Sequence, residues 1–186
     1  MKMAIQYYKN RGKPEKKHFV SLQHGYHGDT IGAMSVGYVP RYFSVYRPLL
    51  RRVTRLPSPA QNLSGRVVKL DEILEETESY LKRISTTTCA LVMESGAQIA
   101  GGVRIFPQGY QKKIAELSNT YGILLILDEI ATGFGRLGSM IEYLKQDSIP
   151  DIVCFGKSLT AGYTPLAVTL TSSEIFQSFL DRRSKF

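Results

Sequence analysis

The sequence predicts an α/β fold in which helices pack on a mostly parallel β-sheet. Short runs of β-branched and other apolar residues alternate with longer amphipathic stretches, which is typical of β-α units. Some of the short runs are apolar at every position, as strands buried on both faces of a parallel sheet require. With 186 residues, 43% of them apolar, the chain is long enough for one domain with its own core.

The expected elements follow one another along the chain. Strands are predicted at residues 18–22, 90–93, 123–127, 151–155 and 166–170. Helices are predicted at residues 71–84 and 107–121, where apolar side chains recur at helical spacing, and Gly122 is suited to end the second helix. We interpret the proline-rich segment 40–59 as an ordered excursion rather than a domain boundary.

Composition excludes several classes of protein. The longest apolar run, residues 123–127, stops at Asp128 and is far too short to span a membrane. The first residues lack the apolar region of a signal peptide, so we expect a cytoplasmic protein without a membrane partner. Cys89 and Cys154 each lie in an apolar, strand-like run, which favours reduced thiols over a disulfide.

The formal net charge of +8 favours acidic partners in general. One alternative is therefore a basic nucleic-acid-binding module that uses Arg51, Arg52 and Arg55, although no RNP, KH, zinc-finger or basic-helix pattern accompanies the charge. A solvated face or a phosphorylated small ligand is the simpler explanation of the charge. His24 and His27 are three residues apart without further ligands nearby, so no metal site is predicted.

Two nucleotide-binding patterns are rejected. Residues 133–138 spell G-x-G-x-x-G, but residues 128–132 separate the first glycine from the end of the predicted strand. Residues 156–158 resemble the end of a P-loop, but Asp151 occupies the position of the required first glycine.

Charged side chains follow three of the predicted strands. Glu94, Asp128 and Lys157 each come at or just after a strand end, and the carboxyl ends of parallel strands meet at one edge of a sheet. Burying the Asp128 carboxylate unpaired is costly, so it needs a cationic partner, whereas alternation directs Glu129 the other way. A lone lysine is usually solvated, but the apolar strand before Lys157 favours a partly desolvated amine, as Schiff-base chemistry requires.

Three segments resemble one enzyme family. Residues 128–136 and 150–157, which read DEIATGFGR and PDIVCFGK, resemble the class III aminotransferases of fold type I, which depend on pyridoxal 5'-phosphate (PLP). Residues 25–36, which read GYHGDTIGAMSV, are more similar to the adenosylmethionine-8-amino-7-oxononanoate aminotransferase branch of biotin synthesis than to the ornithine or 4-aminobutyrate branches. The resemblance covers nearly the whole chain and implies the three-layer αβα large domain of these enzymes.

The resemblance also implies roles in cofactor binding. Lys157 is the expected catalytic residue, which forms a Schiff base with PLP and moves a proton between substrate and cofactor. Asp128 is expected to pair with the protonated ring nitrogen, which makes the ring an electron sink and supplies the missing cation. Tyr26 and Ile130 are expected against the two faces of the ring; the alternative for Tyr26 is a core or interface tyrosine.

Substrate binding is inferred in the same way. Glu94 resembles the glutamate that guards a substrate-carboxylate arginine, Tyr26 and Asp29 are expected at the substrate site, and His27 is expected near it. The implied reaction takes an amino donor and a keto acceptor and converts 8-amino-7-oxononanoate to 7,8-diaminononanoate. Another ω-aminotransferase and a non-catalytic remnant remain as alternatives. Ser95 stands where the family usually has proline.

Family members are over twice as long as this chain, as the resemblance implies. We therefore expect residues 1–186 to be a partial large domain, incomplete at both ends, without the N-terminal phosphate-binding turn and the small C-terminal domain. Residues 1–8 resemble the tail of the helix whose start holds the phosphate, so cofactor binding should be weakened. The site would then need a second copy in a homodimer or a complementary polypeptide.

Overall fold

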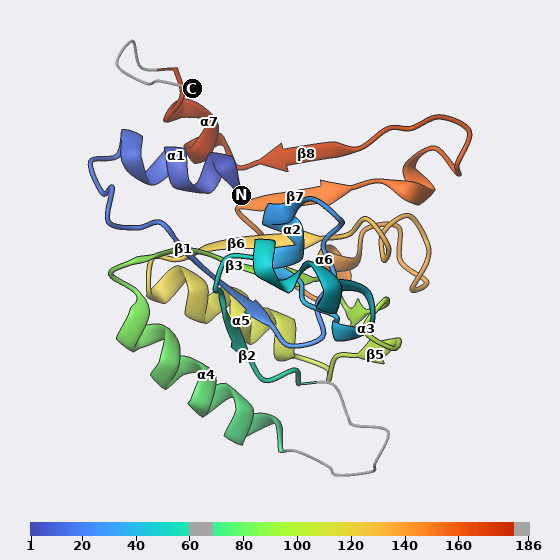
Figure 1. Ribbon diagram of the computed structural model, residues 1–186, viewed down its shortest axis with the longest axis horizontal. Helices are drawn as coiled ribbons and strands as arrows, with labels where there is room; N and C mark the ends of the chain where they lie inside the picture. Colours follow the sequence, from blue (N-terminus) through green and yellow to red (C-terminus); the bar gives the residue numbers. More distant parts are fainter. Residues whose placement is uncertain (60–68, 181–186) are drawn as a thin grey trace.

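The computed structural model describes residues 1–59 and 69–180 and has a central sheet of six strands (Figure 1). Their order is β2-β1-β3-β6-β7-β8. The strands are β1 (His18–Leu22), β2 (Thr54–Leu56), β3 (Thr88–Glu94), β6 (Leu124–Asp128), β7 (Ile152–Phe155) and β8 (Val168–Thr171). All neighbours pair in parallel except β7 and β8, so the predicted mostly parallel sheet is confirmed. A separate antiparallel pair joins β4 (Ala97–Gln98) to β5 (Arg104–Ile105).

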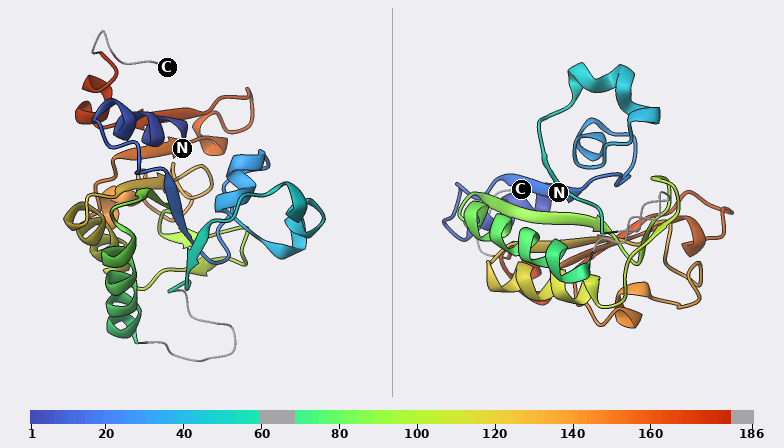
Figure 2. Two further views of the ribbon diagram at one scale, coloured as in Figure 1. Left: turned by 60° about the vertical axis from the view of Figure 1, so that its left-hand side comes forward. Right: turned by 90° about the horizontal axis from the view of Figure 1, so that it is seen from below.

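Helices cover both faces of this sheet (Figure 2). The helical segments are α1 (Lys2–Asn10), α2 (Ile31–Val36), α3 (Pro40–Phe43), η1 (Ser44–Leu49), α4 (Leu70–Ile84), α5 (Tyr110–Thr120), α6 (Glu142–Lys145), η2 (Lys157–Leu159) and α7 (Ser173–Gln177). Helices α4 and α5 pack on one face, α1 and α7 pack on the other, and the α2–η1 segment also stands opposite α4 and α5. The expected three-layer αβα architecture is confirmed. Within the described ranges, every helix is too short or too polar to cross a bilayer.

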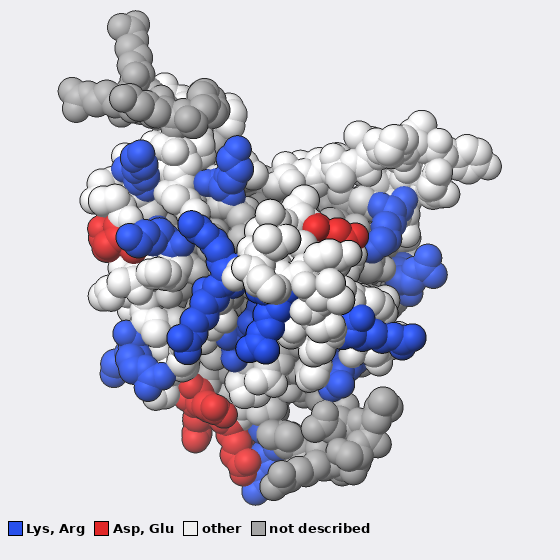
Figure 3. Space-filling model, viewed as in Figure 1, with Lys and Arg blue, Asp and Glu red and all other residues white. Residues whose placement is uncertain are grey.

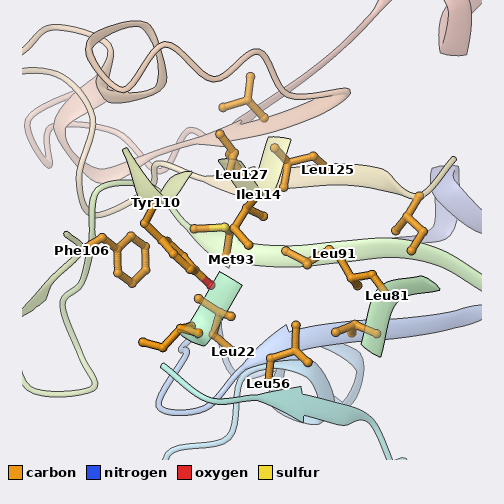
Figure 4. Packing of buried hydrophobic residues seen from close by; sticks show 14 of the residues in the cluster. Leu22, Leu56, Leu81, Leu91, Met93, Phe106, Tyr110, Ile114, Leu125 and Leu127 are labelled. Carbon is orange, nitrogen blue, oxygen red and sulfur yellow. The ribbon is translucent and has the colours of Figure 1, made fainter. Parts of the chain in front are cut away.

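Alternation of side chains explains this layering. On β3 from Ala90 onward and on β6, odd-numbered residues pack with Tyr110 and Ile114 of α5, and even-numbered residues pack with Tyr7 and Tyr8 of α1. Figure 4 shows the first group: Leu91, Met93, Leu125 and Leu127. The same alternation places Glu94 and Asp128, the last residues of their strands, on the α1 side of the sheet.

The order of the strands also predicts where a ligand binds. The connection from β1 to β2 passes over the face opposite α4 and α5, whereas the next two connections run through α4 and α5. The sheet therefore changes winding direction between β1 and β3, and ligands of doubly wound sheets bind beyond the strand ends at such a point. The loops after β1 and β3 are the segments concerned.

Most of the expected elements are present with shifted ends. The helix expected from Pro107 begins at Tyr110, because Gly109 has a left-handed backbone (φ +84°) that a helix cannot contain. The last predicted strand, 166–170, is observed as Val168–Thr171. The excursion at 40–59 is ordered, as expected, and contains α3, η1 and β2. Cys89 and Cys154 are free thiols, as predicted.

Two tyrosines of the two core layers should respond oppositely to loss of their hydroxyl. Tyr110 is fully buried and its hydroxyl has no hydrogen-bond partner among the described residues, whereas Tyr8 donates to the carbonyl of Gly122 at 2.5 Å. We predict that Tyr110→Phe raises the free energy of unfolding by about 1 kcal/mol and that Tyr8→Phe lowers it by about 1 kcal/mol. Urea denaturation followed by circular dichroism measures both. Equal destabilisation by the two variants would show that the Tyr110 hydroxyl is satisfied.

Candidate active site

A cavity of about 280 Å³ lies beyond the carboxyl ends of β1, β3, β6 and β7. Its lining consists of Tyr26, His27, Gly28, Glu94, Ile99, Ala100, Asp128, Ile130, Ala131 and Lys157. The structure thus brings together Tyr26, Glu94, Asp128, Ile130 and Lys157, which the sequence predicts as site residues. Asp29 is the exception, since it lines a neighbouring cavity.

The Asp128 carboxylate already has two partners in this chain. Its Oδ2 lies 2.9 Å from Nδ1 of His27, and its Oδ1 accepts a hydrogen bond from the amide of Ile130 at 3.0 Å. Both side chains of the His27–Asp128 pair are largely buried, with 5% and 12% of their surface exposed. The loop after β1 thus brings an imidazole to the carboxylate, and the expected pairing of Asp128 with a protonated ring nitrogen stays a prediction.

The backbone of Gly37 packs closely against His27. A Cβ atom at Gly37 would lie 2.8 Å from the main-chain nitrogen of His27 and 2.9 Å from its ring carbon Cδ2, so only glycine fits at this position. Gly37 follows α2, whose first turn is capped by the hydroxyl of Thr30. Sequence reasoning placed His27 only near the site and missed this contact. The glycines around it were the available signal, because they indicate a close approach of backbone.

Glu94 fastens the loop after β1 to the loop after β3. It is 4% exposed, and its two oxygens accept hydrogen bonds from the amides of Tyr26 at 3.2 Å and Ile99 at 2.9 Å. Burial raises the pKa of Glu94 to about 7, against the opposing effects of His27 and the two amides. The nearby Asp128, directly opposite in the β3–β6 register, raises it further. The expected role beside a substrate-carboxylate arginine stays a prediction.

Tyr26 forms the wall between two cavities. Its hydroxyl donates to Asp29 at 2.9 Å, and its ring stacks on Phe43 with 5.6 Å between centroids. Burial raises the pKa of Tyr26, and Asp29 adds to this effect. Tyr26 and Ala100 line both the 280 Å³ cavity and a second cavity of about 820 Å³, so they lie between the two. The second cavity is lined by Tyr26, Asp29, Met34, Tyr42, Phe43, Tyr46, Leu49 and Ala100.

Ile130 and Lys157 meet at Gly156. A Cβ atom at Gly156 would lie 3.3 Å from Cγ2 of Ile130, so the glycine allows this side chain to pack closely against the backbone that precedes Lys157. Lys157 itself has a left-handed backbone (φ +41°), a costly conformation that tends to occur at functional sites. However, Lys157 is exposed, so the expected partial desolvation is wrong for this structure. Residues 161–167, a short distance after η2, are exposed as well.

The lining fits the ring of PLP better than its phosphate. Asp128 can accept further hydrogen bonds, because a carboxylate has about four acceptor positions, and it can therefore pair with a ring nitrogen. Ile130 and Tyr26 offer an apolar and an aromatic surface, and Lys157 offers an amine. Among the described residues that line the cavity, Lys157 is the only lysine or arginine. A phosphate group would need donors from elsewhere.

The three arginines named for the nucleic-acid alternative differ in their surroundings. Figure 3 shows lysine and arginine side chains spread over one face with uncharged surface between them. Arg55 is half-buried, donates to the carbonyl of Ser35 at 2.5 Å and lies over the ring of Tyr38. Arg51 and Arg52 are exposed.

In the part of the chain that the structure describes, no three His, Cys, Asp or Glu side chains are arranged to hold a metal ion.

Comparison with known proteins identifies the family. The family described as Aminotransferase class-III matches residues 1–183. This chain belongs to the class III aminotransferases. In that family, adenosylmethionine-8-amino-7-oxononanoate aminotransferase from Aquifex aeolicus (strain VF5) is 42% identical over 97% of this chain, and the enzyme of that name from Staphylococcus aureus (strain NCTC 8325 / PS 47) is 40% identical over 97%. The match spans 41% of the length of each of these relatives.

Solved structures of class III aminotransferases and other transaminases share this fold. The crystal structure of adenosylmethionine-8-amino-7-oxononanoate aminotransferase from Methanocaldococcus jannaschii DSM 2661 matches 97% of this chain and 40% of its own, with a TM-score of 0.84 and 39% identity. An amine transaminase from an uncultivated Pseudomonas species, solved in its PLP-bound form, matches 96% of this chain and 41% of its own, with a TM-score of 0.88 and 35% identity.

Glu94 should make the stability of the fold depend on pH. Because its pKa is about 7 in the fold and 4.5 ordinarily, the folded state binds the proton more tightly. The resulting stabilisation is complete below pH 4.5 and is lost as the pH rises through 7, a change of about 3 kcal/mol. Glu94→Gln should remove this part of the pH dependence and lose one of the two amide hydrogen bonds.

Urea denaturation at pH 4.5 and pH 8 compares the chain with Glu94→Gln and with a matched variant of an exposed glutamate, Glu15→Gln. Parallel pH profiles for the chain and Glu94→Gln would contradict the raised pKa.

Proposed function

We propose that the chain supplies the PLP-binding core of an aminotransferase. The observation that supports this most strongly is the single cavity lined by Asp128, Lys157, Ile130 and Tyr26. Membership of the class III family and the PLP-bound transaminase of matching fold support the cofactor. When bound, PLP supplies an electron sink that stabilises negative charge on a substrate carbon.

Different residues of this chain would bind PLP, orient it and move the proton. Lys157 Nζ would hold PLP through its aldehyde carbon, and once the amino donor takes its place at that carbon, the freed amine would carry the proton at the reacting substrate carbon. Asp128 would keep the ring nitrogen protonated, and His27 at 2.9 Å would orient the carboxylate. Ile130 and Tyr26 would confine the ring between them.

We further propose that the substrates are an amino donor and the keto acceptor 8-amino-7-oxononanoate, with 7,8-diaminononanoate as product. Relatives about 40% identical carry the name of that enzyme, which supports this substrate over those of other ω-transaminases. Glu94, Tyr26 and Asp29 would form the substrate side of the site. Because the match spans 41% of those relatives, we propose a partial large domain that acts in the cytoplasm as part of a homodimer or with a complementary polypeptide.

A non-catalytic remnant of the family is the second candidate. The exposure of Lys157 and the shortage of phosphate donors in the cavity favour it. A remnant would retain the folded sheet and fail to select Lys157.

Chemical labelling of lysines distinguishes the two functions. The chain is treated with less than one equivalent of PLP, the linkage is fixed with borohydride, and modified lysines are mapped by mass spectrometry. We predict that Lys157 is modified several-fold more than any other lysine and that Lys157→Arg removes this preferred site, whereas the control Lys145→Arg leaves it. Label spread evenly over exposed lysines would contradict an aminotransferase site and favour the remnant.

A further inference from the structure

Two acidic residues follow one another at the end of β6, and only the first lines the cavity. Glu129 is fully buried, and its Oε2 and Oε1 accept hydrogen bonds from the amides of Glu142 at 2.9 Å and Tyr143 at 2.6 Å. These amides begin α6, so one carboxylate joins the two ends of the loop 130–141. That loop starts with Ile130 and Ala131, which line the cavity.

The main chain of Glu129 is fixed as well. Its amide donates to the carbonyl of Cys154 on β7 at 2.9 Å, and its carbonyl accepts from the amide of Gly133 at 3.0 Å. Residue 129 is therefore held at its side chain and at both main-chain groups. Asp128 directly precedes it and Ile130 follows it, so the orientation of the Asp128 carboxylate depends on this anchored residue.

A buried polar network supports the Glu129 carboxylate from the α5 side of the sheet. The Ser95 hydroxyl lies near the carboxylate and lowers its pKa, and it accepts a hydrogen bond from Nε2 of Gln111 at 2.9 Å. Gln111 also donates to the hydroxyl of Ser148 at 2.8 Å and accepts from the amide of Gly96 at 2.7 Å. Ser95, Gln111 and Ser148 are each at most 1% exposed. The amide of Ser95 donates to the carbonyl of Asp128, so the network touches both acids.

Both polar groups of Ser95 take part in this arrangement. A proline at position 95 would have neither the hydroxyl near Glu129 nor the amide that donates to the carbonyl of Asp128. The carboxylate is met by amides and a hydroxyl rather than by a lysine or arginine, and burial raises its pKa with a further contribution from Glu142. A buried carboxylate satisfied in this way fixes a geometry more than it adds stability.

We infer that Glu129 is a positioning residue for Asp128, held in place by Ser95, Gln111 and Ser148. This inference rests on the proposed function, and it adds that the direction of the Asp128 carboxylate toward PLP is set from the opposite face of the sheet. Asp128 and Glu129 are thus neighbours in the chain, but their carboxylates lie in different surroundings.

Nuclear magnetic resonance of the 186-residue chain tests the inference without cofactor. Two signals report the Asp128 carboxylate directly: the amide of Ile130, which donates to Oδ1, and the imidazole of His27, which meets Oδ2. We expect Glu129→Gln and Ser95→Ala to shift both signals. Glutamine has one acceptor oxygen, so hydrogen exchange of the Glu142 or Tyr143 amide should also accelerate about tenfold or more in Glu129→Gln.

Ser118→Ala is the matched control, because Ser118 is buried and its hydroxyl has no partner among the described residues. It should leave the Ile130 and His27 signals in place. Unchanged signals in Ser95→Ala, or in a folded Glu129→Gln with accelerated exchange, would overturn the inference and leave Glu129 as a simple loop fastener. If the signals shift while PLP fails to select Lys157, the proposed function is refuted and the positioning role stands.

Discussion

A carboxylate at the end of a buried apolar strand is the constraint on which the rest of the site depends. Asp128 follows the fully buried Leu127, and an unpaired charge at this depth would cost several kcal/mol, so hydrogen-bond partners must be brought to it. The chain delivers them from two directions: His27 from the loop after β1, and the amide of Ile130 from the next turn. The contact between His27 and Asp128 requires that β1 lie beside β3 and that position 37 be a glycine.

The period of two along β3 and β6 divides the polar groups between the faces of the sheet. Glu94 and Asp128 lie side by side in register on one face, where the first fastens the Tyr26 loop and the second lines the cavity. Glu129 instead meets Ser95, which joins it to Gln111 on α5. Consecutive acids therefore enter different environments, as the side-chain alternation of a strand requires. Glu129 thus holds the backbone beside the cavity without lining it.

Local pattern predicted the elements that rest on periodicity. The apolar runs of β3 and β6 and the helical spacing of α4 could be recognised because burial on two faces, or on one stripe, leaves a regular trace. The His27–Asp128 contact joins residues 101 apart, and no local rule relates them. The exposure of Lys157 depends on how the chain continues past η2, and the partners of Ser95 depend on how α5 packs. Family motifs located Asp128 and Lys157, but tertiary structure alone gives their surroundings.

The function proposed for this chain requires that Asp128 hold a proton on the ring nitrogen of PLP. The most direct test uses PLP enriched with ¹⁵N at that nitrogen, bound to the chain and to Asp128→Asn, with the ¹⁵N chemical shift measured in each. The account predicts a protonated ring nitrogen beside Asp128 and an unprotonated one beside asparagine. The same chemical shift in both proteins would contradict it.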